Sequence, residues 1–459
     1  MSDVVSTERR GWLWWWPART RGDWIWLLST FAIGTLGLGA FLAYRRRALQ
    51  AAAKGKGPKR PSEPLIWPTP EEVREYEQIL FSDDRALQSE GLKTIYQQTT
   101  SRLTHDNVRE NGLLDVLIRF LATFPEPLLM LTTSALTNLS VNEENCRAMA
   151  QGNAISLLLD LLNDARSSAK LRENVLRAMT NLATVRENED RIREAGALPH
   201  LLALFEEGQE REVPQEVLFQ ASRVLVNLID NEKNYTVILE NNGLEHTIRY
   251  LHSTEDIEFL RRLVRLLGCF ALPADAPTYN RIATAENAER LAAIFQKHQA
   301  EGDDRIDHIL LAIAKIVGEQ HANDKAKQDK LREFQTAFTS DERGLAAIFS
   351  FLTDENAQRR NCAKAVLHDL VRNNAEALES LREVANAAVA NNNISAAQQE
   401  ALARCLAIAE EELRKANKST EEGQAQRSGE EEEQQQQQKN EDQDADVGRE
   451  DDGEEKVEQ

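Results

Sequence analysis

Apolar residues recur at helical spacing in three consecutive stretches between Ser134 and Leu251, and short polar turns separate the stretches. In the second stretch, Leu198, Leu201 and Phe205 would lie on one face of a helix. A single amphipathic helix cannot cover its own apolar face, so neighbouring elements must pack against it. The pattern therefore predicts an all-α region built from stacked helices.

The three stretches also repeat one another at a period of about 45 residues. Each contains an Asn before an apolar residue, a second Asn seven residues later, and then a Gly. The first Asn series is Asn138, Asn181 and Asn227; the second is Asn145, Asn188 and Asn234; the glycines are Gly152, Gly196 and Gly243. We expect the second Asn to cap a short helix, and the Gly to end that helix at positive φ.

This order of Asn, second Asn, Gly and a Leu pair resembles the armadillo repeat, most closely in the segment SALTNLSVNEEN that begins at Ser134. The resemblance implies three-helix units stacked into an armadillo-type α-solenoid, a right-handed superhelix. It also implies that the helix bearing the first Asn lines a concave groove that binds extended peptides. Weaker copies extend the pattern to residues 71–416, with Cys269 replacing Asn in one of them and the next such helix at residues 306–317.

The groove helices supply the candidate binding residues. The amides of Asn138, Asn181 and Asn227 could donate to and accept from a peptide backbone. One helical turn earlier, on the same face, stand Ser134, Arg177, Arg223 and Arg265. Arginines in a row favour acidic or phosphorylated segments. The alternative interpretation is structural: the Asn side chains bond to the backbone of the adjacent repeat, and the Arg side chains pair with acids such as Glu173.

No motif indicates catalysis. The sequence has no Gly-rich phosphate loop, no nucleophile elbow, and no Cys or His spacing typical of a metal site. We therefore expect a non-catalytic protein without metal or cofactor.

The N-terminus is organised differently. Trp24–Tyr44 is 21 residues without a charge, which is long enough for a transmembrane helix. Four Lys and Arg precede it and seven lie in residues 45–60, so the positive-inside rule puts the C-terminal body in the cytosol. Small residues at Thr35, Gly39 and Ala43 could support a homodimer through this helix. The residues expected at the membrane interface are Trp12, Trp14, Trp15, Trp16, Trp24, Trp26, Arg45, Arg46 and Arg47.

The resulting organisation is a Trp- and Arg-rich segment (1–23), a signal anchor (24–44), a basic, Pro-rich linker (45–70), the repeats (71–416) and an acidic, Gln-rich segment (417–459). It resembles the armadillo proteins anchored in the mitochondrial outer membrane. That resemblance implies an adaptor on the cytosolic face, acting in organelle distribution or dynamics. The endoplasmic reticulum is the alternative membrane, and a chaperone cofactor that clamps a folded partner domain is the alternative function.

The distribution of charge along the chain predicts which kinds of partner to expect. The chain carries a net charge of -20, and residues 417–459 hold sixteen Asp and Glu against five Lys and Arg. With almost no apolar residues, this acidic segment is predicted to be disordered. The acidic body makes nucleic acid an unexpected partner, and protein partners are expected instead. The acidic segment could also occupy an Arg-lined groove of its own chain.

Overall fold

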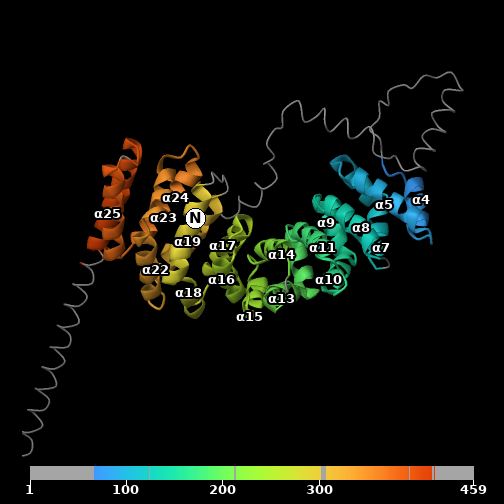
Figure 1. Cartoon of the computed structure of the whole chain (residues 1–459), viewed down its shortest axis with the longest axis horizontal. Helices are drawn as coiled ribbons and strands as arrows, with labels where there is room; N and C mark the ends of the chain where they lie inside the picture. Colours follow the sequence, from blue (N-terminus) through green and yellow to red (C-terminus); the bar gives the residue numbers. More distant parts are fainter. Residues whose placement is uncertain are drawn as a thin grey trace, which may run out of the picture. The chain divides into compact units, whose positions relative to one another are not determined.

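The structure is a computed structural model that describes residues 67–122, 125–210, 213–300, 306–391, 393–415 and 418. Every regular element in these ranges is a helix, and they contain no strand (Figure 1). The chain divides into two compact units, residues 1–157 and 158–459. The predicted all-α class is therefore confirmed for the described part of the chain.

The first unit begins with a helix whose start follows from its sequence. Helix α4 begins at Pro70, where Thr69 accepts a hydrogen bond from the Glu72 amide and the Glu72 carboxylate accepts one from the Thr69 amide, at 2.8 Å. This reciprocal capping satisfies two backbone donors that a helix start leaves open. The helices of this unit are α4 (Pro70–Leu80), α5 (Arg85–Thr99), η2 (Arg102–Thr104), α6 (His105–Glu110), α7 (Leu113–Phe120), α8 (Glu126–Leu139) and α9 (Glu143–Gln151).

Helix α10 (Ala154–Asn163) contains the division between the units, and the second unit follows it. The helices of the second unit are α11 (Ala169–Leu182), α12 (Arg186–Glu194), α13 (Ala197–Glu210), α14 (Gln215–Leu228), α15 (Glu232–Glu240), α16 (Gly243–Ser253), α17 (Ile257–Ala271), α18 (Ala276–Ile282), α19 (Ala285–Ala300), α20 (Asp307–Val317), α21 (Glu319–Ala322), α22 (Gln328–Ser340), α23 (Glu342–Ser350), η3 (Phe351–Thr353), α24 (Ala357–Val371), α25 (Ala375–Ala390) and a last helix at residues 396–415.

A three-helix period runs through this order. In the described ranges, five successive repeats consist of a short helix, a second helix and a third helix; they are α6–α7–α8, α9–α10–α11, α12–α13–α14, α15–α16–α17 and α18–α19–α20. Within each unit the third helices pack on one another. In the first unit α5, which precedes the first of these repeats, packs on α8. In the second unit the pairs are α11 with α14, α14 with α17 and α17 with α20, and α20 packs on α24, which follows the last of these repeats.

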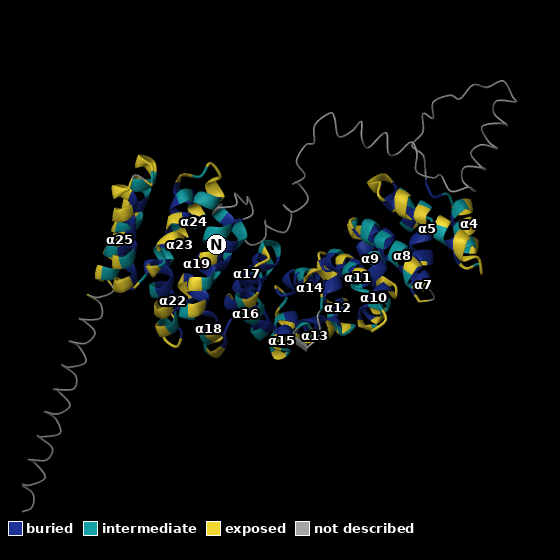
Figure 2. Cartoon of the chain, in the orientation of Figure 1, coloured by how far each residue is buried: buried dark blue, intermediate teal, exposed yellow. Residues whose placement is uncertain are grey.

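Figure 2 shows that, within each unit, buried residues gather on the helix faces that meet neighbouring helices. One close contact of this kind joins α17 to α20. A Cβ atom added to Gly268 would stand only 2.8 Å from the Cα atom of Ala312, so the two helices can approach this closely only because position 268 has no side chain.

The second Asn series has a different role from the predicted one. These residues lie inside the short helices, and each donates from Nδ2 to the carbonyl of the residue six positions earlier, at 3.1 Å; the pairs are Asn145 with Leu139, Asn188 with Leu182 and Asn234 with Leu228. Those carbonyls end the third helices and have no intrahelical partner. The side chains that cap the short helices are instead Asn142 and Asn231. The predicted capping role was therefore wrong by one helical turn.

The same buried amides connect consecutive repeats. Arg109 on α6 donates to the Asn145 Oδ1 atom at 2.9 Å, and Arg193 on α12 donates to the Asn234 Oδ1 atom at 3.1 Å. Each of these Asn side chains therefore bonds to the end of the helix before it and to the short helix of the preceding repeat.

Positive φ was predicted at three glycines and is confirmed at one. Gly196 has φ +78° between α12 and α13. Gly152 is extended at φ -79°, and at the third site Asn242, with φ 59°, adopts the left-handed conformation before Gly243. Asn is the residue that tolerates this conformation best after Gly.

The expected signal anchor at Trp24–Tyr44 lies outside the described residues, together with the Trp and Arg residues predicted to flank it and almost all of the acidic segment. Among the described residues, no helix is both long enough and apolar enough to cross a bilayer.

Candidate partner-binding surface

The first Asn series lies on the third helices and bonds to neighbouring repeats. Asn138 on α8 donates to the Thr99 Oγ1 atom of α5 at 3.3 Å, and Asn227 on α14 donates to the Thr180 carbonyl of α11 at 3.1 Å. All three members of the series are half-buried. Asn227 therefore makes the backbone bond of the structural interpretation, whereas Asn138 bonds to a side-chain hydroxyl of the neighbouring repeat; peptide binding by these amides stays a prediction.

Ser134, also on α8, uses its hydroxyl within its own helix. The Oγ atom donates to the Met130 carbonyl at 2.7 Å, and the side chain is half-buried. A serine bonded back to the preceding turn keeps only acceptor capacity for a partner. Its predicted place in a peptide-binding groove stays a prediction.

Arg177 and Arg223 are brought together by the packing of α11 on α14. Burial lowers the pKa of the half-buried Arg223 guanidinium below its ordinary value, and the positive charge of Arg177 lowers it further. Arg223 donates to the Gln220 Oε1 atom at 2.8 Å, whereas Arg177 has a carboxylate, Glu173, at 3.8 Å. No carboxylate of the described ranges pairs with Arg223, so this cation is partly desolvated without an anion to compensate it.

The same arrangement continues on the next two third helices. Lys315 on α20 donates from Nζ to the Cys269 Sγ atom of α17 at 3.6 Å. Burial raises the pKa of the Cys269 thiol, the positive charges of Lys315 and Arg265 oppose that rise, and the Asp230 carboxylate adds to it, so two cations and one anion act on this sulfur atom. Within the described part of the chain, Lys315 has no carboxylate partner at ion-pair distance.

We call these four residues the basic row: Arg177, Arg223, Arg265 and Lys315, one from each of α11, α14, α17 and α20. The row ends at α24, where Asp369 stands at the position of Cys269 and Lys315, one turn after the position of the three arginines. Its carboxylate accepts a hydrogen bond from Arg372 at 2.7 Å, so position 369 is already neutralised. The basic row lies entirely within the second unit.

Lys315 was not singled out from the sequence. It stands 46 residues after Cys269, which is the same interval as between Asn181 and Asn227. The repeat period could therefore have found it. We did not predict it because these two degenerate repeats have Cys269 and Lys315 where the clear repeats have Asn.

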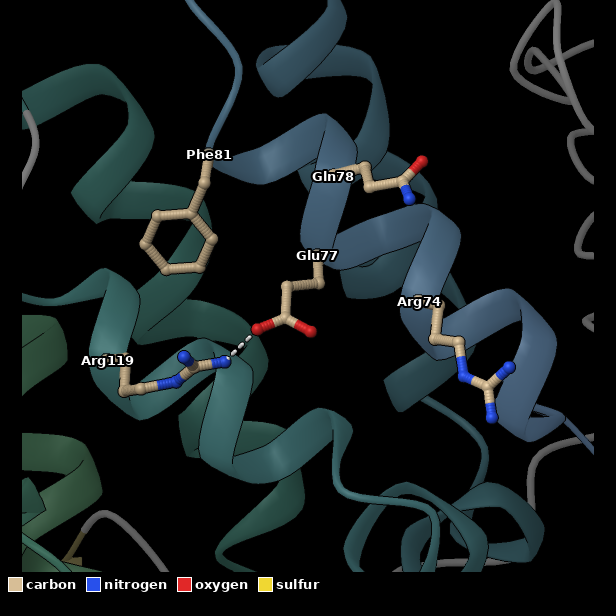
Figure 3. A pocket seen from close by; sticks show the side chains of 5 residues that line it. All are labelled: Arg74, Glu77, Gln78, Phe81 and Arg119. Carbon is tan, nitrogen blue, oxygen red and sulfur yellow. Dashed lines mark hydrogen bonds and ion pairs between the residues drawn. The ribbon is translucent and has the colours of Figure 1, made fainter.

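A shallow depression in the first unit is the other candidate. It measures about 480 Å³ and is lined by Arg74, Glu77, Gln78, Phe81 and Arg119. Figure 3 shows the Glu77 and Arg119 side chains pointing toward each other as an ion pair, and Arg119 also lies over the Phe81 ring at 5.5 Å. Because its opposite charges neutralise each other and it is open to solvent, this depression offers little to recognise a ligand.

Comparisons with known proteins bear on the fold. No family model matches the sequence, and no curated protein matches it. Among solved structures, an engineered protein matches with a TM-score of 0.51 and 18% identity over 73% of this chain and 87% of that chain. A designed armadillo repeat protein in complex with the peptide (KR)4 matches at 0.46 and 21% identity, over 53% of this chain and 99% of that one. Computationally designed armadillo repeat proteins for modular peptide recognition match at 0.41 and 22%, over 58% and 99%.

At such identities these likenesses concern the fold alone. The three-helix period of the described chain is that of armadillo repeats, and the chain is an all-α helical repeat protein like them. The handedness of a superhelix stays a prediction.

Proposed function

We propose that this chain is a non-catalytic scaffold that binds an extended acidic or phosphorylated segment of a partner protein along the basic row. The observation that carries the proposal is Arg223, a half-buried guanidinium beside Arg177 without a carboxylate partner in the described ranges. An anion bound there would offset both the desolvation of Arg223 and its repulsion from Arg177. Arginine also binds carboxylates and phosphates through two parallel hydrogen bonds.

The spacing of the row supports an extended ligand. Neighbouring packed helices lie about 8–10 Å apart, so successive cations of the row recur at roughly that interval. A segment in the polyproline II conformation advances about 3.1 Å per residue with three residues per turn, so acidic side chains at every third residue would lie on one face about 9 Å apart and meet successive helices. A partner segment with spaced acidic residues therefore fits the row better than a folded domain does.

The test is a fluorescence anisotropy titration of the full chain with a labelled peptide of about twelve residues in which Glu recurs at every third position. We expect the variant carrying Arg223→Gln and Lys315→Gln to bind at least about tenfold more weakly, since hydrogen bonds to charged groups contribute about 1.5–3 kcal/mol each and tenfold corresponds to about 1.4 kcal/mol.

The matched control carries Lys233→Gln and Lys325→Gln. Both lysines are exposed, both lie in the second unit, and their replacement changes net charge by the same amount away from the row. Binding to the control should stay within twofold of the unmodified chain. If both variants lost affinity for the peptide equally, binding would depend on net charge and not on the basic row, which would contradict the proposal. The absence of binding by the unmodified chain would refute the proposed function.

We further propose that the scaffold is tethered to a membrane through Trp24–Tyr44, with its body in the cytosol, and that the membrane is the mitochondrial outer membrane. The support is the uncharged 21-residue stretch and the following Arg45, Arg46 and Arg47. The test compares the location of the full chain with that of residues 61–459, each tagged at its C-terminus. Only the full chain should reach mitochondria, and external protease should remove its tag. Reticular staining or a protected tag would contradict this assignment.

A further inference from the structure

We propose that the acidic segment, residues 417–459, occupies the basic row of its own chain and must be displaced by a partner. This inference rests on the proposed function, because it assigns a regulator to the same surface. Its support comes from where the described chain ends, how long the segment is, and how its charge compares with that of the row.

The last described helix delivers the segment to the end of the row. Glu412 in the final turn of helix 396–415 forms an ion pair with His368 of α24 at 2.9 Å, and Glu410 pairs with Arg382 of α25 at 2.6 Å. Leu402 and Ala409 of the same helix are buried. The chain therefore leaves the helical body next to α24, which packs directly on α20, the helix that carries Lys315.

The segment is long enough to follow the whole row. From α24 to α11 there are four steps between packed neighbours, which amount to roughly 40 Å. The 43 residues of the segment could extend to roughly 140 Å. Chain length therefore permits contact with each of the four cations.

Charge favours this occupant. The segment has sixteen acidic residues against five basic ones, and the whole chain has a net charge of -20. Arg223 and Lys315 offer the segment cations without a carboxylate partner in the described ranges. By contrast, Arg359 in α24 is already paired with both Asp307 and Asp354.

Covalent attachment makes this competition effective. A segment joined to its site acts at an effective concentration on the order of millimolar. If the free segment bound with a dissociation constant on the order of 0.1 mM, its presence in cis would weaken the apparent affinity for a partner peptide about tenfold.

The experiment uses the full chain with all sixteen acidic residues of 417–459 replaced by Asn and Gln, and the same labelled Glu-containing peptide as probe. The peptide should bind about tenfold more tightly than to the unmodified chain, and this gain should disappear when Arg223→Gln and Lys315→Gln are added. Equal affinity for the neutralised and unmodified chains would overturn the inference and leave the proposed function standing. Failure of both chains to bind would refute the proposed function itself.

A second measurement detects the contact directly. Zero-length carbodiimide coupling of the dilute full chain, followed by mass spectrometry, should join Lys315 to a carboxylate within 417–459. The internal control is Lys297, whose Nζ lies 2.9 Å from the Glu255 carboxylate. Coupling of Lys297 to Glu255 without any coupling of Lys315 to the segment would also overturn the inference.

Discussion

Replacing Asn234 by Ala tests whether the buried amides hold the repeats together. The Asn234 side chain is fully buried; it donates to the Leu228 carbonyl and accepts from Arg193, both at 3.1 Å. Asn234→Ala removes both bonds, so the Leu228 carbonyl at the end of α14 keeps only its bond of 3.3 Å from the Asn231 amide.

The expected cost follows from these contacts. Loss of one of the two hydrogen bonds to the Leu228 carbonyl costs about 0.5–1.5 kcal/mol, and a bond to a charged group contributes about 1.5–3 kcal/mol. Arg193 keeps its ion pair with Asp190 at 2.6 Å, so we take the lower half of the second range. Ala also gains about 0.5 kcal/mol over Asn in helix propensity. The free energy of unfolding should fall by about 1.5–3 kcal/mol.

The assay is urea denaturation followed by circular dichroism at 222 nm, with Asn227→Ala as the control. Asn227 is only half-buried and, among the described residues, donates one hydrogen bond, of 3.1 Å, to the Thr180 carbonyl, so its loss should cost about 1 kcal/mol or less. If Asn234→Ala destabilised the chain no more than Asn227→Ala does, the buried amides would not be the connection between repeats that we describe.

Two further perturbations test the packing of the second unit. Gly268→Leu should lower the free energy of unfolding by roughly 3 kcal/mol, because the Leu Cβ atom alone would stand 2.8 Å from the Ala312 Cα atom. Helix propensity taken alone predicts the opposite, a gain of about 1 kcal/mol. Stabilisation in a urea titration would therefore contradict the close contact of α17 with α20. Burial, together with the positive charge of the nearby Lys327, lowers the pKa of His321 from 6.5 to about 4. Because protonation then favours the unfolded chain, the contribution of neutral His321 is complete above pH 6.5 and is lost as pH falls toward 4, up to about 3 kcal/mol. His321→Gln should lack this part of the pH dependence of the urea midpoint, and identical pH profiles for the two chains would refute the assignment.

The fold was predictable because the features that determine it recur in the sequence. The period of about 45 residues, the apolar helix faces and the Gly196 turn each follow from local chemistry that a sequence displays. Expected helices at 306–317 and from residue 71 onward match α20 and α4 closely. The division of the chain into two units has no such mark, since it depends on contacts between helices.

The candidate site was only partly predictable. An Asn at a helix start can cap that helix or bond to the end of the previous one, and a shift of one turn decides between these roles. For this reason Asn234 was misassigned, whereas Asn231 is the cap. Arg177 and Arg223 could be placed on one face from spacing, but their proximity and the half-burial of Arg223 appear only when α11 packs on α14.

Charge reversal of the row tests the central claim most directly. Arg223→Glu combined with Lys315→Glu should exchange the preference of the surface, measured as anisotropy titrations with two labelled peptides that carry Glu or Lys at every third position. We predict that the unmodified chain binds the Glu peptide more tightly despite its own net charge of -20, and that the reversed variant binds the Lys peptide more tightly. A preference of the unmodified chain for the Lys peptide, or an unchanged order of affinities after reversal, would contradict recognition of acidic segments by the basic row.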